Sequence, residues 1–439
     1  MSALTIKEYE SILSAEMVPA LGCTEPIAIA LCTAKARELL GQEPETIELE
    51  LSGNVIKNAY SVFVPNSGGR KGLLYAAALG ICGGNAAAEL EVLEGINDED
   101  RQCADKLVES GKIKMSHKSG VACLYVKCRL TAGGEENDKN EEFKSATAAI
   151  ARGHSQFIYL EQNGKVLLDQ ELISDDNELK LTELKLRLNF PDIWQMAASE
   201  EFSKSELLRD LIDRQIKCNW DIAEEGMKGE WGQEVGLSYI EGVDVDLQTK
   251  AIAYAAAGSD ARMAGCAMPV VINSGSGNQG MCLAIPLIYI ARESGKSEEL
   301  LHRALFVANL SALYQKNVIG KLSAYCGAVS AAAASAAGLA FLEGCSYEVA
   351  EGALINALSV SSGLVCDGAT GSCAGKILVS LENAYMGLKM AKRGKVYPPG
   401  EGLGGSSLEE CIRNVGRLAH PGMVETDAEI LQILLDSEV

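Results

Sequence analysis

The sequence predicts an α+β protein with a mainly helical body of packed Ala- and Gly-rich helices and a small inserted α/β subdomain. Three observations lead to this prediction. The second half contains long runs of Ala, Gly and Ser, as in "YCGAVSAAAASAAGLA". A middle stretch alternates apolar and polar residues, which is typical of strands. Of the 439 residues, 47% are hydrophobic, so the chain can bury a substantial core.

The N-terminal part predicts two helices followed by short strands. "TIKEYESILSAEMVPA" has apolar residues at helical spacing, and "PIAIALCTAKARELL" begins with Pro26, a residue favoured at the start of a helix. Alternation from Thr46 to Leu51 and again around Val62 predicts strands separated by a Gly-Asn-containing loop. Helices resume from Gly72 to Leu93.

The pattern changes between Gly111 and Glu171. Here we expect two strands, an acidic loop "GEENDKNEE", a short helix, and a hairpin that turns at Asn163-Gly164. Amphipathic surface helices follow, and from Asp244 onward the composition indicates a bundle whose helices approach closely. We therefore expect three parts: residues 1–110 within the main body, the inserted subdomain over 111–175, and a helical domain over 176–439.

Charge and composition exclude several classes of function. The net charge of −21 repels phosphates, so we expect no binding to nucleic acid or to an anionic membrane. The N-terminus has no apolar signal segment, and the 14 Cys then point to the reducing cytoplasm, where thiols serve metals or catalysis and do not form disulfides. The apolar stretch from Leu322 to Leu342 is mostly Ala, Ser and Gly, which favours a buried helix over a membrane span.

Three Cys stand out as candidate metal ligands. Cys366 and Cys373 flank a Gly-rich break in a helical run, and Cys326 precedes another Ala-rich run. Three converging thiolates suit an iron–sulfur cluster that keeps one iron open for substrate. The alternative is that all three are buried free thiols. Nine others are expected to be core or incidental: Cys32, Cys82, Cys103, Cys123, Cys128, Cys218, Cys266, Cys345 and Cys411.

Polar residues in two places could act on a substrate. Cys23 stands at the entrance of the second helix, where the dipole lowers a thiol pKa, so it could be a base; the alternative is that Thr24 caps the helix and Cys23 only fills space. His154, at a possible helix-to-strand corner, could be an acid or base, although a single His of this kind is more often structural.

Two further segments could bind a small polar substrate. Both are rich in Gly, and the alternative for both is that these are ordinary turn residues. The second segment precedes an apolar helix expected to start near Met281, whose N-terminus would favour a carboxylate. The candidate binding residues are Lys57, Asn58 and Asn66 in the first segment and Ser274, Ser276, Asn278 and Gln279 in the second.

The segments "LGCTEPIAIA", "SGNVIKNAYSVFVPNSG", "SGSGNQGMCLAIP" and "GLVCDGATGSCAGKI" make the chain resemble the L-cysteine desulfidases, once an uncharacterised protein family. The C-terminal half also resembles the α domain of iron–sulfur L-serine dehydratases, in which three Cys hold the cluster. The matching positions are Cys326, Cys366 and Cys373. The loop between the last two is shorter here, and the C-terminal Cys of the dehydratases is absent.

The resemblance implies a lyase that carries a [4Fe–4S] cluster with one open iron site, held by the domain over 176–439. Its substrate would be L-cysteine, eliminated to pyruvate, ammonia and sulfide, with Cys23 as the first choice of base and His154 as the second. Partners would be a small amino-acid substrate and, by default, a second copy in a homodimer.

Alternative functions are L-serine dehydration on the same cluster, a non-catalytic iron–sulfur sensor of cysteine or redox state, and a pyridoxal-dependent lyase. A sensor would more often have a separate output domain, which the sequence does not show. No Lys stands in a setting that clearly indicates a pyridoxal Schiff base.

Overall fold

The computed structural model describes residues 3–133, 143–170, 176–242, 244–320 and 323–436. The chain forms two compact units. One, which we call the helical unit, comprises Met1–Ala20, Ser174–Cys366 and Gly371–Asp427. The other, the sheet unit, comprises Leu21–Ile173, Asp367–Thr370 and Ala428–Val439. The acidic loop predicted over 134–142 and Leu322 lie outside the described residues.

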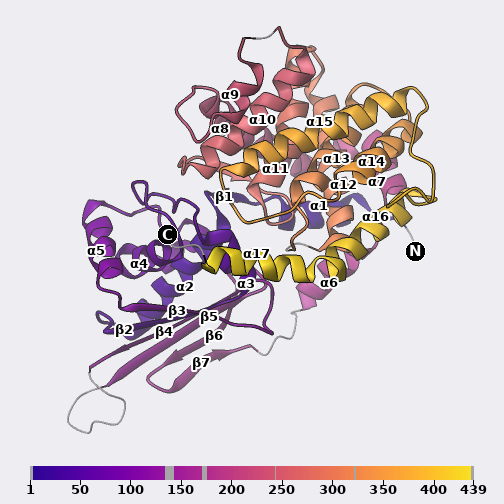
Figure 1. Ribbon diagram of the computed structural model, residues 1–439. Helices are drawn as coiled ribbons and strands as arrows, with labels where there is room; N and C mark the ends of the chain where they lie inside the picture. Colours follow the sequence, from indigo (N-terminus) through magenta and orange to yellow (C-terminus); the bar gives the residue numbers. More distant parts are fainter. Residues whose placement is uncertain (1–2, 134–142, 171–175, 243, 321–322, 437–439) are drawn as a thin grey trace. The chain divides into compact units, whose positions relative to one another are not determined.

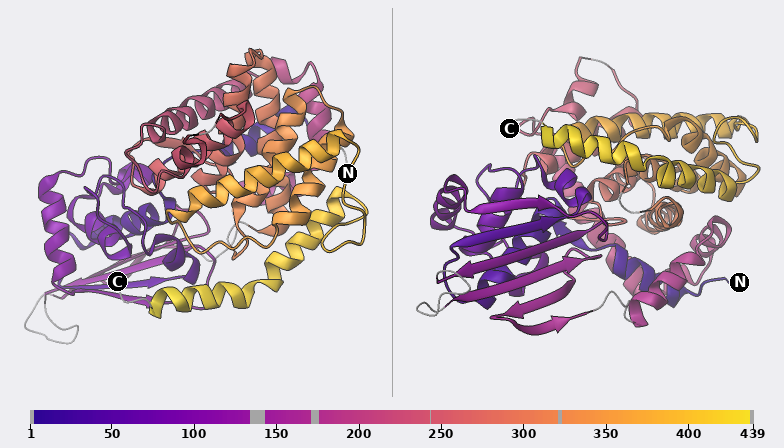
Figure 2. Two further views of the ribbon diagram at one scale, coloured as in Figure 1. Left: turned by 45° about the horizontal axis from the view of Figure 1, so that its top comes forward. Right: turned by 60° about the horizontal axis from the view of Figure 1, so that its bottom comes forward.

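The sheet unit is built on a six-stranded sheet with the strand order β3-β2-β4-β5-β6-β7 (Figure 2, right). β2 pairs in parallel with β3, and every other pair is antiparallel. β2 and β3 are joined through three helices, which is the long crossover that a parallel pair requires. The strands are β2 (Thr46–Leu51), β3 (Ile113–His117), β4 (Tyr125–Ala132), β5 (Lys144–Ala151), β6 (Phe157–Gln162) and β7 (Lys165–Asp169).

Helix α2 packs against β4, β5 and β6, and α4 packs against α2 (Figure 1). The close packing of these two helices depends on Gly80, because a Cβ there would collide with Thr33 and Ala30 of α2. The helical segments of this unit are α2 (Thr24–Leu40), α3 (Gly53–Ala59), α4 (Leu73–Gly83), a 3-10 segment (Ala86–Glu91) and α5 (Asp98–Glu109).

The structure confirms the helices and the hairpin of this part and corrects three elements. The strand predicted around Val62 is not formed, because among the described residues there Phe63 and Lys71 make only an isolated antiparallel bridge. Asn163 and Gly164 turn between β6 and β7 with positive φ of 50° and 76°, as an Asn-Gly hairpin requires. The Gly-Asn segment predicted as a loop is helix α3, because Ser52 begins a helix directly after β2. The short helix predicted before the hairpin is strand β5, whose Ala-rich run is buried between β4 and β6. Helix propensity is overridden there by strand pairing.

The expected boundary at residue 110 falls inside the sheet unit. β2 precedes this boundary and β3 follows it, yet the two pair residue by residue from Ile47 with Ile113 to Leu51 with His117. Sequence patterns report local structure only. Because three helices separate β3 from β2 along the chain, the pattern gave no sign that the two strands belong to one sheet.

The helical unit contains the Ala- and Gly-rich bundle that the sequence predicts. α13 is its central helix and packs against α11, α12, α14 and α15. Almost every residue of α13 is buried, and its small side chains allow the close approach. The helices are α1 (Ile6–Glu16), α6 (Asp176–Leu186), α7 (Phe190–Ala198), α8 (Glu206–Gly226), α9 (Val235–Ile240), α10 (Leu247–Met263), α11 (Gly277–Glu293), α12 (Glu298–Ile319), α13 (Gly327–Leu342), α14 (Tyr347–Ser361), α15 (Ser372–Lys392) and α16 (Leu408–Arg417). The last helix, α17 (Val424–Asp436), begins in this unit, and its residues from Ala428 onward belong to the sheet unit.

A two-stranded sheet of β1 (Pro19–Leu21) and β8 (Pro269–Val271) completes the regular structure, and two short segments, Phe202–Lys204 and Leu418–Gly422, connect helices. Of the described helices, none combines the length and the apolar character needed to cross a lipid bilayer.

One expectation about the cysteines is wrong. Cys82, at the end of α4, and Cys103, on α5, form a disulfide with their Cα atoms 6.0 Å apart. Both had been expected to remain thiols. The pairing depends on how α5 packs against α4, and the sequence pattern gave no sign of it.

Candidate functional site

Two of the predicted metal ligands, Cys326 and Cys366, lie on neighbouring backbone segments of the helical unit. Tyr325 and Val365 form an isolated antiparallel bridge. The N–H of Cys326 donates to the carbonyl of Leu364 at 3.0 Å, and the N–H of Cys366 donates to the carbonyl of Ala324 at 2.7 Å. Each Cys directly follows a bridge residue, and because the bridge is antiparallel, the two Cys lie diagonally across it, on opposite sides of the Tyr325–Val365 pair.

Cys326 and Cys373 both stand at helix N-termini. Cys326 is the N-cap residue of α13, and Cys373 is the second residue of α15. Unpaired N–H groups and the helix dipole at these ends favour a negatively charged sulfur. The Ala- and Gly-rich helices thus place two of the three thiols where a thiolate is stabilised.

The three thiols interact electrostatically. Burial, together with the charges of Cys366 and Cys373, raises the pKa of the Cys326 thiol to about 12, although the N–H of Ala328 and the charge of Lys376 oppose the rise. Removing a proton from Cys326 is therefore costly while its neighbours are anionic. A metal centre bound to the three sulfurs would relieve this repulsion.

The donor set fits an iron–sulfur group, because such clusters are held by Cys thiolates. Among the described residues, however, no three His, Cys, Asp or Glu side chains gather closely enough to hold a metal ion as they stand. Cys326, Cys366 and Cys373 are thus neighbours on a fixed backbone, and their side chains would have to converge on the group.

The predicted Ser- and Gly-rich loop leads into helix α11, which begins at Gly277 and not near Met281. Buried amides hold the loop in place. The hydroxyl of Ser274 donates to the side chain of Asn273 at 2.9 Å, and the side chain of Asn273 donates to that of Asn309 at 3.0 Å. Ser276 is the N-cap and accepts from the N–H of Gln279 at 3.4 Å.

The hydroxyls of Ser274 and Ser276 are therefore used in building the loop. The amide oxygen of Asn278 accepts from Arg262 at 3.2 Å and from Ser259 at 3.4 Å, both on α10. Sequence reasoning missed Arg262, because nothing in "SDARMAG" separates it from a surface Arg at the end of a helix. In the structure it is only 5% exposed.

The start of α11 also touches the start of α13. A Cβ on Gly327 would lie 2.5 Å from the side-chain amide of Gln279, so only glycine fits beside this side chain. One turn further, the Cys282 thiol contacts the carbonyl of Ala328 at 3.7 Å. The N-terminal ends of α11 and α13 thus lie together, with Gln279 next to the residue that follows Cys326.

The sheet unit contains the predicted residues Cys23, Lys57, Asn58, Asn66 and His154. Cys23 is buried at the N-cap position of α2 and makes no side-chain capping bond. The next residue, Thr24, does not cap the helix as the alternative proposed; its hydroxyl donates to Glu25 at 3.1 Å.

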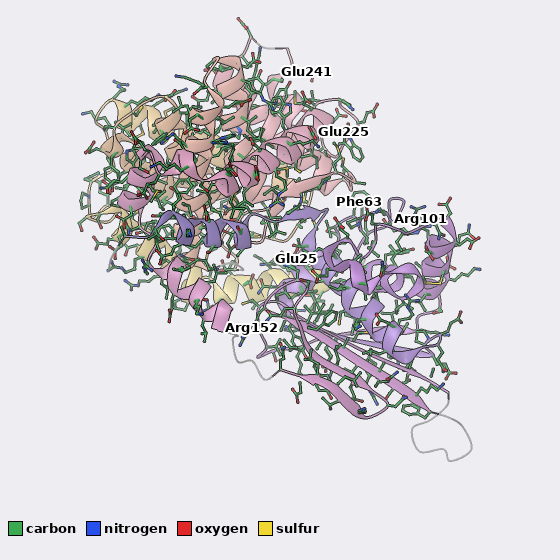
Figure 3. All side chains as sticks on the ribbon, turned by 180° about the vertical axis from the view of Figure 1, so that it is seen from behind. Glu25, Phe63, Arg101, Arg152, Glu225 and Glu241 are labelled. Carbon is green, nitrogen blue, oxygen red and sulfur yellow. A yellow bond between two sulfur atoms is a disulfide. The ribbon has the colours of Figure 1, made fainter. Side chains whose placement is uncertain are left out.

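Glu25 is the centre of a polar cluster in this unit. Its carboxylate accepts from Asn58 at 3.0 Å and lies 4.0 Å from Nε2 of His154. Burial alone would raise the pKa of Glu25, but the adjacent His154 and the hydrogen bonds from its own N–H and from Asn58 hold it well below its usual range. Figure 3 labels Glu25 and also Arg152, two residues before His154.

The structure therefore brings together Asn58 and His154, which the sequence could place only in separate segments, and adds Glu25 between them. The sequence did offer one signal, because Glu25 stands in the "CTEP" elbow at a helix start. Nε2 of His154 is buried and makes no hydrogen bond to a described residue, and the Glu25 carboxylate is a charged group that lies beside it.

Lys57 and Asn66 have different surroundings. Lys57 is 3% exposed, and its carbonyl oxygen lies against Gly368, at the tip of the loop between Cys366 and Cys373; a Cβ at Gly368 would collide with it. Asn66 has a positive φ of 56° and donates to the carbonyl of Leu93 at 3.1 Å, so its amide holds the turn.

Comparison with known proteins gives the family. The model of the serine dehydratase alpha chain matches residues 87–432. A UPF0597 protein of Finegoldia magna is 39% identical over 431 residues, covering 98% of this chain and 100% of the relative. UPF0597 proteins of Lachnoclostridium phytofermentans, at 40%, and Treponema denticola, at 38%, cover 98% of this chain and 100% and 98% of their own lengths. The chain thus belongs to the serine dehydratase alpha chain family and to the UPF0597 proteins.

Proposed function

We propose that the protein is an iron–sulfur-dependent lyase that eliminates sulfide from L-cysteine to give pyruvate, ammonia and sulfide. The observation that carries the proposal is the neighbourhood of Cys326 and Cys366 across the backbone bridge between Tyr325 and Val365, with Cys373 close enough to interact electrostatically with Cys326. The match to the serine dehydratase alpha chain supports a lyase of this type, whose members use such a cluster.

Cys326, Cys366 and Cys373 would hold a [4Fe–4S] cluster with one iron left open. When bound, the cluster supplies a Lewis acid that accepts a soft sulfur ligand. The chain's own residues would do the remaining work. The Ser274–Gln279 loop and the segment with Lys57, Asn58 and Asn66 would hold the substrate, and a base would take its α-proton.

For that base we propose Cys23 or His154. The Glu25 carboxylate favours His154, because it stabilises the imidazolium that forms when the ring takes the proton. The electron pair of the broken C–H bond forms the Cα–Cβ double bond, and the C–S pair leaves with sulfide. The aminoacrylate that is released tautomerises and is hydrolysed to pyruvate and ammonia.

The second candidate is L-serine dehydratase activity, which the family match favours. The same proton transfer would then expel hydroxide in place of sulfide. A sensor of cysteine or redox state would bind the same cluster and ligand without turnover. We further propose that the protein is located in the cytoplasm of the cell and that it forms a homodimer.

The test is anaerobic purification and reconstitution with iron and sulfide, followed by assays with L-cysteine and L-serine. We expect roughly four irons per chain, as a [4Fe–4S] cluster requires, and sulfide and pyruvate in equal amounts from L-cysteine. Pyruvate from L-serine alone would assign the dehydratase activity. Activity that survives removal of iron and shows a pyridoxal absorbance band would contradict both. Cys23→Ala is expected to retain its iron.

A further inference from the structure

Arg262 is a buried arginine that lies against the start of α11. It lies in the last turn of α10, is 5% exposed, and its guanidinium Nε would stand 2.6 Å from a Cβ on Gly277. Gly277 is the first residue of α11. A buried cation is therefore placed against a helix N-terminus, which is itself positive. A guanidinium and a helix N-terminus that lie together both favour an anion nearby.

The cation is held in position by α11 and α10. Asn278 accepts from Arg262 at 3.2 Å and from Ser259 at 3.4 Å, and its amide NH₂ group contacts the sulfur of Met263 at 3.5 Å. The other nearby charged group on α10, Asp260, directs its carboxylate to the N–H of Gly236 at 3.3 Å. Asn278 therefore acts as a support that orients the guanidinium.

Gln279 gives a second, independent sign of a ligand. It is 7% exposed, and its amide oxygen makes no hydrogen bond to any described residue. Such buried acceptors are uncommon, because an unmade hydrogen bond is costly. The side chain reaches the start of α13, where it lies against Gly327 beside Cys326. The unused acceptor thus lies next to Gly327, the residue that follows Cys326.

We infer that Arg262 binds the carboxylate of the substrate and that Gln279 accepts a hydrogen bond from its ammonium group, so the site selects small α-amino acids. This inference rests on the proposed function for the identity of the substrate. A guanidinium can bind a carboxylate through two parallel hydrogen bonds. An amide oxygen suits an ammonium donor. Asn278 is then a positioning residue and not a substrate ligand.

Three small probes separate these interactions: L-alanine carries both groups and no leaving group, propionate carries only the carboxylate, and ethylamine carries only the ammonium. Their binding to the anaerobic holoprotein is measured by calorimetry. We expect the wild type to bind L-alanine most tightly and propionate more tightly than ethylamine. Arg262→Met should weaken L-alanine and propionate binding roughly 100-fold, and Arg262→Lys roughly 10-fold, because Lys lacks the planar fork.

Gln279→Leu should weaken L-alanine binding and leave propionate binding unchanged. Arg292→Met, on the last turn of α11, is the matched control and should bind all three probes like the wild type. If Arg262 had only a structural role, Arg262→Met would have a lower Tm but would bind the three probes in the same order of affinity as the wild type. Folded Arg262→Met with wild-type affinity for L-alanine would overturn the inference.

If Arg262→Met does not fold, the binding of the three probes to Arg262→Lys and to the wild type still tests the inference. Equal wild-type affinity for propionate and ethylamine, or no binding of L-alanine, would overturn the inference. Turnover separates the two proposals. A wild type that binds L-alanine as expected but converts neither L-cysteine nor L-serine would refute the proposed function and uphold the carboxylate site.

Discussion

Tyr325 and Val365 pair across an isolated antiparallel bridge, and the residue after each is a candidate cluster ligand. The bridge joins the start of α13 to the segment that follows α14. Backbone hydrogen bonds join the two segments on either side of the bridge, so the main chain holds Cys326 and Cys366 near each other. The same backbone pairing that joins these two segments therefore also positions two of the candidate cluster ligands.

Iron content tests the ligand set. Cys326→Ala, Cys366→Ala and Cys373→Ala should each lose most of the iron after anaerobic reconstitution, because three thiolates are needed to hold the cluster. Cys345→Ala, in the same unit and in the turn after α13, should keep it. Iron quantification together with the visible absorbance spectrum measures the effect. Full iron in Cys373→Ala would remove that residue from the set.

Gly368 should be required for the geometry of the loop between Cys366 and Cys373. Its φ of 112° is unfavourable for other residues, and an added methyl group would collide with the carbonyl of Lys57. We expect Gly368→Ala to lower iron retention and the Tm. Gly363→Ala, at a glycine with no neighbour within 4 Å of its Cβ position, should change neither. Normal iron in the Gly368 variant would show that the loop can move without loss of the ligands.

The pair of Glu25 and His154 should act as one unit in proton transfer. Glu25→Gln keeps the acceptor for Asn58 but removes the charge beside the imidazole, so we expect kcat to fall roughly 100-fold, the lower end of what loss of a general base costs. In His154→Asn, kcat should fall by the same factor, and in the double variant kcat should fall no further than in either single variant. Glu38→Gln on the exposed face of α2 is the control. Additive losses would separate the two residues.

Asp260 predicts a pH dependence of stability. Burial raises its pKa from 3.8 to about 6, although the N–H of Gly236 opposes the rise. Between these values the folded protein binds more protons than the unfolded chain, so stability falls as the pH increases through this window. The loss is on the order of 3 kcal/mol. The free energy of unfolding, measured with denaturant from pH 4 to pH 7, should depend less on pH in Asp260→Asn than in the wild type. An equal dependence on pH in both proteins would exclude Asp260 as the cause.

The disulfide between Cys82 and Cys103 should stabilise the sheet unit. It closes a loop with a sequence separation of 21, and a cross-link of this size restricts the unfolded chain by about 3 kcal/mol. We expect dithiothreitol to lower the stability of the wild type to that of Cys103→Ala, and to leave this variant unchanged. Denaturant unfolding with and without the reductant measures the difference. A wild type insensitive to reductant would show that the cross-link contributes nothing.

Local patterns were sufficient for much of the fold. Helices α1, α2 and α13 and the hairpin at Asn163 and Gly164 follow from apolar spacing and turn chemistry, which act within a few residues. The strand β5 was missed because its Ala-rich sequence favours a helix in isolation, and only pairing with β4 and β6 makes it a strand. The disulfide of Cys82 and Cys103 depended in the same way on contacts between helices.

The sequence by itself determined the residue types of the candidate site: three Cys among small residues, the Ser- and Gly-rich loop before α11, and the polar elbow before α2. Tertiary structure decided which of them meet. It placed Cys366 beside Cys326, Arg262 against Gly277, and Glu25 next to His154. These contacts join segments far apart in the chain, and the spacing of residues along a sequence carries no information on which distant segments pack together.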